Sequence, residues 1–134
     1  MHEILFRGKR MDNGAWETGS LVIARMGCHD AQYYIADKMT GYHTPVDPST
    51  IGQYTGMKDK NGKRIFEGDI VKTSDITHEG VIQILRESFE IAMRKGCWVM
   101  VAGEDWDFLE TNRECIEVAG NIHDNPDMLK GGDG

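Results

Sequence analysis

Apolar and polar residues alternate in several stretches of the chain, with the two-residue period of a half-buried β-strand. The pattern is clear near the start, where EILFRGKRM and AWETGSLVIA flank Asp12-Asn13-Gly14. An Asn-Gly step is the strongest short-range hairpin signal, because both residues tolerate positive φ. The sequence therefore predicts a β-hairpin over residues 3–24. A short strand at residues 32–36, rich in aromatic and β-branched residues, is predicted to follow.

The middle of the chain contains its densest pattern, IGQYTGMKDKNGKRIFEGDIV, from Ile51 to Val71. The preceding residues 37–49 contain one glycine and two prolines, which favours an irregular connection. Within the dense stretch we predict a short strand, a turn at residues 59–62 and a second short strand. A bend at residues 67–69 then leads into another strand.

The second half is also predicted to be β-rich, with strands at residues 80–86, 97–101 and 115–118. Residues 84–93 fit two patterns, because their apolar residues suit a strand face by period two and a helix by spacings of three and four. Residues 105–112 are acidic and predict a short helix or a loop. Pro126 favours a short helical turn, because proline suits the first helical position.

These elements predict a mainly β protein, or a β-rich α+β protein. An N-terminal hairpin and connecting region, residues 1–67, would join a small SH3-like barrel, residues 68–126, and a flexible tail, residues 127–134. The tail overlaps the short C-terminal helical turn. One integrated domain is the alternative, because 134 residues suit a single core.

The charge is distributed unevenly along the chain. The net charge is −7; residues 1–67 carry nine Lys/Arg against eight Asp/Glu, and residues 68–134 carry six against fourteen. An acidic second half repels phosphate, so nucleic acid is disfavoured as a partner. Three cysteines without paired spacing suit a reducing compartment. No apolar run suits a membrane span or a signal peptide, and we predict a cytoplasmic protein.

Metal and cofactor motifs are matched poorly. The DKNG segment resembles the opening of a calcium loop, but Lys63 stands where the third ligand belongs. The glycines at 52, 56 and 62 are not followed by the Gly-Lys-Ser/Thr of a nucleotide loop. For zinc, Cys28-His29 is an adjacent pair, while Cys97, Cys115 and His123 are isolated. We predict no cofactor and no metal.

Two groups of residues are candidates for partner binding. Trp106 and Phe108 lie in an acidic segment, and aromatic groups flanked by charge often mark a docking surface. The simpler alternative is that one ring caps the barrel. Arg7, Lys9 and Arg10 could touch a phosphate or an acidic partner, although cations also keep an exposed strand edge soluble.

Catalysis has little support in the sequence. Asp69, or a pair from the acidic run at residues 104–107, could act as acid or base. The simpler interpretation is that Asp69 caps a bend by accepting backbone N–H groups. The adjacent Cys28 and His29 would point to opposite faces of a strand. We therefore predict a non-enzymatic protein with no catalytic residues.

Three segments together resemble the YopX family of phage and prophage proteins. They are EILFRGKRMDNGAWETGSLV, VDPSTIGQYTGMKDKNGKRIFEGDIV and IEVAGNIHDNP. The likeness extends from Glu3 to about Pro126, and residues 73–114 match only in general character. It implies a small phage or prophage protein that acts in the bacterial cytoplasm and forms homo-oligomers. It implies no activity, so no catalytic residues are carried over.

Three functional hypotheses follow. The leading one is a self-associating phage accessory module that binds another protein, from the host or the phage. The second is a nucleic-acid-associated regulatory protein whose basic residues converge on one face, namely Arg7, Lys9, Arg10, Lys60, Lys63 and Arg64. The third is an enzyme that uses Asp69 or the acidic run, which would require a concave pocket with two ionisable groups.

Overall fold

The structure is a computed structural model that describes residues 4–25, 27, 30–76, 82–102, 105–112 and 115–129. Within these residues the protein is mainly β, as predicted, and forms two compact units, Met1–Tyr54 and Thr55–Gly134. The Cys28-His29 pair and the end of the predicted tail, residues 130–134, lie outside the described residues. No helix in the described ranges is both long enough and apolar enough to cross a membrane.

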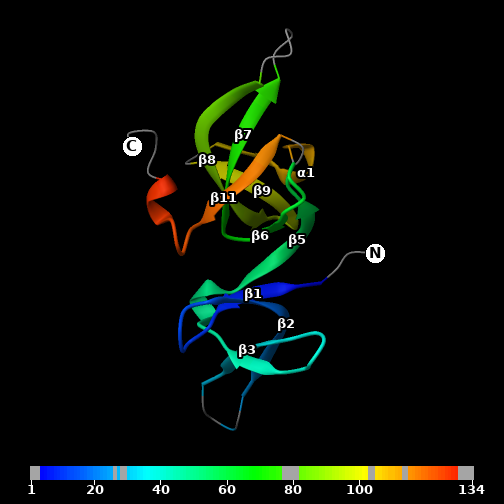
Figure 1. Cartoon of the computed structure of the whole chain (residues 1–134), viewed down its shortest axis with the longest axis vertical. Helices are drawn as coiled ribbons and strands as arrows, with labels where there is room; N and C mark the ends of the chain where they lie inside the picture. Colours follow the sequence, from blue (N-terminus) through cyan, green and yellow to red (C-terminus); the bar gives the residue numbers. More distant parts are fainter. Residues whose placement is uncertain are drawn as a thin grey trace. The chain divides into compact units, whose positions relative to one another are not determined.

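The first unit is an antiparallel sheet (Figure 1). Its strands are β1 (Phe6–Lys9), β2 (Trp16–Ala24), β3 (Gln32–Ala36), β4 (His43–Pro45) and the beginning of β5 (Gly52–Lys58). They lie in the order β4-β3-β2-β1-β5. A 3-10 helix, η1 (Pro48–Thr50), precedes β5, and Asp47 caps it by accepting the backbone N–H of Ser49. The predicted N-terminal hairpin and the strand after it are therefore confirmed.

The turn of the first hairpin is wider than a two-residue Asn-Gly turn. The carbonyl of Arg10 accepts the N–H of Gly14, and the carbonyl of Ala15 accepts the N–H of Arg10. Among the described residues of this turn, only Gly14 has positive φ, at 74°. Asn13 instead accepts the N–H of Ala15 with its side-chain oxygen, at 2.9 Å. The hairpin forms where the Asn-Gly signal predicts it, with the two residues in different roles.

The core of the first unit is small and depends on one close backbone approach. Leu5, Ile35 and Val46 are almost fully buried. Gly19 in β2 is also buried, and a Cβ atom there would overlap the carbonyl oxygen of Ala36 in β3. Only glycine therefore allows β2 and β3 to pack at this spacing.

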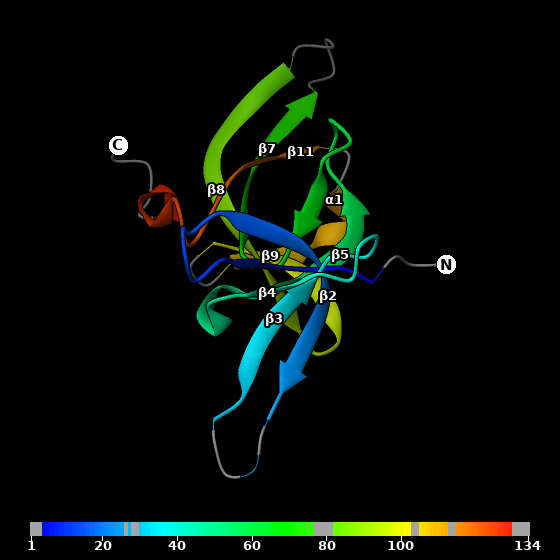
Figure 2. The same cartoon turned by 60° about the horizontal axis from the view of Figure 1, so that its bottom comes forward.

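The second unit contains an antiparallel five-stranded sheet in the order β10-β9-β8-β7-β11 (Figure 2). The strands are β7 (Asp69–Ile76), β8 (Ile82–Arg94), β9 (Cys97–Ala102), β10 (Asp105–Phe108) and β11 (Ile116–Asn121). The later part of β5 and β6 (Arg64–Phe66) also belong to this unit, together with α1 (Leu109–Asn112) and the 3-10 helix η2 (Pro126–Leu129). Buried apolar residues cluster on one face of the sheet: Ile65, Val71, Ile91, Met100, Leu109 and Ile116.

The structure changes three sequence-based predictions in this unit. Residues 84–93 belong to one long strand, β8, so the helical alternative for them is wrong. Residues 105–108, predicted as helix or loop, form strand β10 because they pair with β9, and only the following four residues are helical. The SH3-like barrel is not confirmed, because the described strands form open sheets. At Leu109, which is fully buried, the chain passes from β10 into α1 and does not continue as a strand that could close the sheet.

Candidate functional site

A groove of about 440 Å³ in the second unit is a concave surface that could hold a ligand. We call it the aromatic groove, and its lining residues are Arg94, Lys95, Cys97, Val99, Trp106 and Phe108. These residues come from the end of β8, the turn that follows it, and strands β9 and β10. The volume lies within the range of small-ligand and side-chain pockets.

The register of three strands places these side chains on one face of the sheet. Phe108 lies opposite Val99, which lies opposite Ala92 on β8. Trp106 lies two residues before Phe108 and opposite Val101, while Arg94 lies opposite Cys97. Directly opposed residues of antiparallel strands share a face, as do residues two apart on one strand. The buried core residues Ile91 and Met100 alternate with these positions and therefore occupy the other face.

A tight turn places the cations at one end of the groove. Lys95 and Gly96 connect β8 to β9, and their φ values of 50° and 81° match a type I′ hairpin turn. Lys95 is the one non-glycine residue with positive φ among the described residues. Arg94 and Lys95 are both exposed. We call these two residues the cationic end of the aromatic groove.

The aromatic pair forms an apolar surface that water reaches. The rings of Trp106 and Phe108 meet edge to face, with centroids 5.2 Å apart and planes at 88°. Trp106 is 51% exposed and Phe108 is 46% exposed, whereas Val99 beside them is 1% exposed. An edge-to-face pair is a preferred aromatic geometry and holds both rings in defined positions. The barrel that one of these rings was expected to cap is not confirmed.

Two carboxylates lie close to the groove in the sequence but do not line it. Asp107 occupies the position between the two aromatic residues and therefore points to the other face of β10. Its carboxylate accepts the backbone N–H of Phe108 at 2.8 Å. Glu110 is exposed at the start of α1. Among the residues that the structure describes, no Asp or Glu lines the groove, and the described lining consists of cations, a thiol and apolar groups.

The basic residues predicted as partner-binding sites lie in the first unit. Lys9 and Trp16 are opposed across β1 and β2. The Arg7 guanidinium lies 4.6 Å from the centroid of the Trp16 ring, and the Lys9 ammonium lies 5.5 Å from it. Cation–π contacts of this length stabilise a hairpin face by about 0.5–1 kcal/mol each when exposed. Both side chains therefore have a structural role that the sequence did not reveal.

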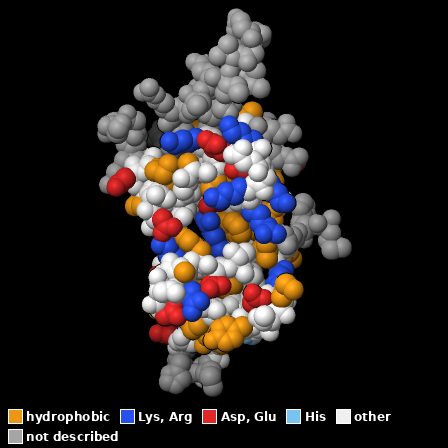
Figure 3. Space-filling model, in the orientation of Figure 1, with side chains coloured by type: hydrophobic (Ala, Val, Ile, Leu, Met, Phe, Trp, Pro, Cys, Tyr) orange, Lys and Arg blue, Asp and Glu red, His pale blue; other side chains and the backbone are white. Residues whose placement is uncertain are grey.

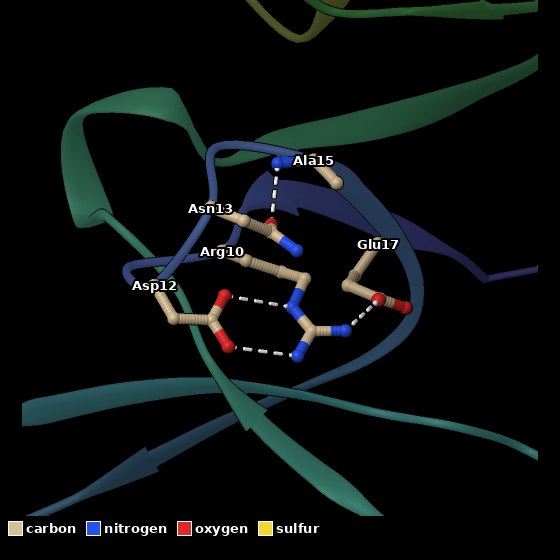
Figure 4. Close-up of polar contacts among 5 residues, drawn as sticks. All are labelled: Arg10, Asp12, Asn13, Ala15 and Glu17. Carbon is tan, nitrogen blue, oxygen red and sulfur yellow. Dashed lines mark hydrogen bonds and ion pairs between the residues drawn. The ribbon is translucent and has the colours of Figure 1, made fainter.

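Arg10 is held by two carboxylates of its own hairpin (Figure 4). Its guanidinium donates two hydrogen bonds to Asp12, both of 2.9 Å, and one of 3.1 Å to Glu17. The hydrogen bonds that Arg10 donates to Asp12 and then to Glu17 raise the pKa of Arg10. The hydrogen bonds from Arg10 also lower the pKa of Asp12. With two carboxylates bound, Arg10 adds little positive potential for a partner.

Asp69, the candidate acid or base, lies in the bend where it was predicted to act as a cap. It is 2% exposed, and its carboxylate accepts the backbone N–H of Phe66 at 2.7 Å. Gly68 beside it has φ 88°. The capping interpretation is confirmed. Asp69 is not among the residues that line the aromatic groove.

Asp59, from the segment resembling a calcium loop, binds backbone donors. One carboxylate oxygen accepts the N–H groups of Asn61 and Lys63, both at 2.9 Å, and the other accepts the N–H of Val118 in β11 at 2.9 Å. Burial opposes ionisation, but the hydrogen bonds, led by that from Val118, outweigh it and lower the pKa of Asp59. The carboxylate thus connects the turn to β11, and both of its oxygens face N–H donors.

The cysteines that the structure describes are free thiols. Cys97 is exposed in the aromatic groove and Cys115 is half-buried. Over the described ranges, no three His, Cys, Asp or Glu residues come close enough to hold a metal ion.

The structure adds four residues to the site that the sequence did not single out. Trp106 and Phe108 were predicted, whereas Arg94, Lys95, Cys97 and Val99 become neighbours of the ring pair only through strand pairing. The Lys95-Gly96 step between two apolar stretches was the one available signal, because glycine after a polar residue favours a tight hairpin turn.

Comparison with known proteins identifies the family and supports the fold. Protein EF1440 from Enterococcus faecalis, known from a crystal structure, is similar at 22% identity with a TM-score of 0.53. The match covers 96% of this chain and 99% of that one. A comparison with curated protein sequences finds no significant match. The family model described as YopX protein matches residues 6–130, and the chain therefore belongs to the YopX family.

Proposed function

We propose that this protein is a non-enzymatic binding module that docks another protein in the aromatic groove. The observation that carries the proposal is the half-exposed pair of Trp106 and Phe108 beside the buried Val99. Aromatic residues on a rigid, concave surface are the commonest hot spots of protein interfaces. The strands on which they stand are paired and need little ordering when a partner binds.

The exposed parts of the two rings could supply useful binding free energy. A fully buried aromatic side chain removes about 150–250 Å² from water, so the exposed halves of two rings correspond to roughly 150–250 Å² together. At about 25 cal/mol per Å², burying this area is worth on the order of 4–6 kcal/mol before the costs of association. That range suits a hot-spot cluster at the centre of a protein interface.

Self-association is the second part of the proposal. Three large side chains of the first unit are well exposed: Ile23 at 56%, Tyr42 at 71% and Met39 at 95%. Figure 3 shows hydrophobic side chains gathered on the surface over β3. Ile23 lies opposite Tyr33 at the start of β3, whereas Met39 and Tyr42 lie in the turn between β3 and β4. Apolar side chains that gather on a surface are frequent at subunit contacts. Light scattering at several concentrations tests this, and a strict monomer throughout would contradict it.

Together with family membership, these surfaces support a role as a phage or prophage accessory protein in the cytoplasm of a bacterial host. Affinity capture from native host cells tests the docking proposal. Wild type is compared with W106A/F108A and with the control M11A, which removes an exposed apolar side chain of the first unit that neither part of the proposal uses.

The proposal expects one protein to be recovered with wild type and with M11A and to be lost with W106A/F108A. Recovery of the same protein with all three baits, or of none with wild type, would overturn it. Because about half of each ring is buried, removing each ring should lower the unfolding free energy by about 2–3 kcal/mol by the same area estimate. A cooperative unfolding transition that lies above the assay temperature for W106A/F108A would therefore show that the variant is still folded when the protein is lost.

A nucleic-acid role has weaker support. Arg7 and Lys9 lie over Trp16, and Arg10 is bound by Asp12 and Glu17. The other basic residues of that hypothesis, Lys60, Lys63 and Arg64, belong to the second unit. Nonspecific binding of nucleic acid needs several cations that release counterions together.

A further inference from the structure

The chemical character of the aromatic groove changes along its length. Three cross-strand rows can be followed along it: Glu90, Val101 and Trp106; then Ala92, Val99 and Phe108; then Arg94 and Cys97. Lys95 follows in the turn. The face therefore changes from a row that contains a carboxylate, through an apolar row, to the cationic end.

We infer that the occupant of the groove is a protein segment with an Asp or Glu side chain one to three residues from a large apolar side chain. The apolar side chain packs against the exposed surfaces of the Trp106 and Phe108 rings, which lie beside Val99. The carboxylate lies at Arg94 and Lys95. This inference deepens the docking role proposed above and rests on it.

Charge complementarity carries the choice of an acidic segment. The two charged residues among the described lining residues, Arg94 and Lys95, are cations. They stand in a unit whose sequence carries ten Lys/Arg against sixteen Asp/Glu, a net charge of −6 over residues 55–134. A basic segment would be favoured by that overall charge but would meet two like charges inside the groove. Salt screens charges that lie more than about 8 Å away at physiological ionic strength, so Arg94 and Lys95, rather than the net charge of the unit, determine which sign of charge the groove binds.

A single-stranded nucleic acid is the other ligand that aromatic rings and cations can bind. Such ligands need a positive track along the phosphate backbone as well as stacking surfaces. Here the exposed Asp107 and Glu110 lie next to Phe108 in the sequence, and the two lining cations are confined to one end. A peptide with one localised negative group fits this distribution better than a chain of phosphates.

The segment docks through its side chains and adds no strand to the sheet. β10 is an edge strand of the five-stranded sheet. The backbone N–H of Phe108 is already bound to the carboxylate of Asp107. A strand that paired with β10 at Phe108 would have to displace this bond, and edge carboxylates commonly prevent such pairing. At the cationic end, the charges of Arg94 and Lys95 can pair with the side-chain carboxylate of an Asp or Glu within the segment.

The test uses a random nonapeptide library displayed within a loop, so that no free carboxyl terminus is present. Three baits select from it in parallel: wild type, W106A/F108A, and the charge reversal R94E/K95E. A fourth bait, K58E/K60E, is the matched control, because it reverses two cations of the same unit outside the lining residues.

Wild type and K58E/K60E are expected to enrich peptides with Asp or Glu one to three residues from Leu, Ile, Phe or Trp. R94E/K95E is expected to bind those peptides about 10-fold or more weakly and to enrich Lys or Arg at the same spacing. Affinity of the wild-type peptides for wild type should also fall as salt rises. Peptides that need Trp106 and Phe108 but bind R94E/K95E equally well would overturn the inference and leave the docking role intact.

Three further outcomes would overturn the inference. Enrichment that is equal on W106A/F108A, or no enrichment on wild type, would overturn the inference together with the docking role. Fluorescein-labelled dT15 and U15 are measured in parallel. Binding of either oligonucleotide at micromolar concentration, if lost in both groove variants, would replace the peptide by a nucleic acid and overturn the inference.

Discussion

Replacing Asp59 by alanine should destabilise the second unit more than the loss of an ordinary turn residue. Asp59 is 6% exposed and accepts three backbone N–H groups. Two of them, from Asn61 and Lys63, belong to exposed residues and can turn to water in the variant. The third, from the half-buried Val118, comes from a strand 59 residues away in the sequence.

The magnitude follows from these three bonds. A hydrogen bond to a charged group contributes about 1.5–3 kcal/mol when its partner is left buried, and a solvated one about 0.5 kcal/mol. D59A should therefore lower the unfolding free energy by about 2.5–4 kcal/mol. In a domain of 60–100 residues this corresponds to a melting temperature lower by roughly 10–30 °C. D59N should lie between, because its amide oxygen can serve two donors while its NH2 group faces the third.

Asp37 provides the matched control. Its exposed carboxylate accepts the N–H groups of Met39 and Thr40 at 2.8 and 3.0 Å and so makes the same kind of local turn, without a long-range donor among the bonds described. D37A should cost about 0.5–1 kcal/mol. Urea unfolding gives the free energies, and hydrogen exchange shows whether the loss is confined to residues 55–129. If D59A and D37A agree within about 0.5 kcal/mol, the bond to Val118 does not carry the stability assigned to it.

Three further predictions concern pH, backbone packing and thiol chemistry. The pKa of Asp59 is lower in the folded than in the unfolded protein, so the stability that its carboxylate contributes is complete above pH about 4 and is lost as the pH falls through the folded pKa. The urea midpoint should therefore fall less in D59N than in wild type between pH 4 and pH 2. Parallel curves of midpoint against pH for the two proteins would contradict this. Alanine at Gly19 would overlap the Ala36 carbonyl and force β2 from β3, lowering the unfolding free energy by about 1–3 kcal/mol, whereas S20A on the same strand should have little effect. In a C28S background Cys97, exposed in the groove, should react with a disulfide reagent several-fold faster than the half-buried Cys115. A peptide selected for the groove should slow the reaction of Cys97. Equal reaction rates for Cys97 and Cys115 would show that the groove is covered in solution.

Local chemistry was sufficient to predict the turns. Gly14, Gly62 and Gly68 all have positive φ, at 74°, 82° and 88°, where a side chain would be strained. Asp59 and Asp69 were recognised as possible turn carboxylates from the residues around them, and both accept backbone N–H groups. Such assignments succeed because the partners lie within a few residues.

Pairing between strands was harder to predict. Residues 105–108 contain two aspartates, which are poor strand formers, yet they form β10 because they pair with residues 99–102 of β9. In the same way the apolar spacing of residues 84–93 suits a helix, but pairing with β7 and β9 makes them part of a strand. The bond from Val118 to Asp59 and the cations beside Phe108 both depend on such long-range registers.

Architecture and recognition use different parts of this chain. The segments that carry the family resemblance, residues 3–22, 46–71 and 116–126, contain the turn residues Asp59 and Asp69, and also Asn121, whose side-chain oxygen accepts the N–H groups of His123 and Asp124. The aromatic groove is built from Arg94 to Phe108, outside all three segments. A strand and turn framework fixed by backbone hydrogen bonds tolerates changes in side chains that point away from its core. Family members that share this framework should therefore differ in what their grooves bind, and exchanging only the exposed groove-lining residues 94, 95, 97, 106 and 108 between two of them should transfer the ligand.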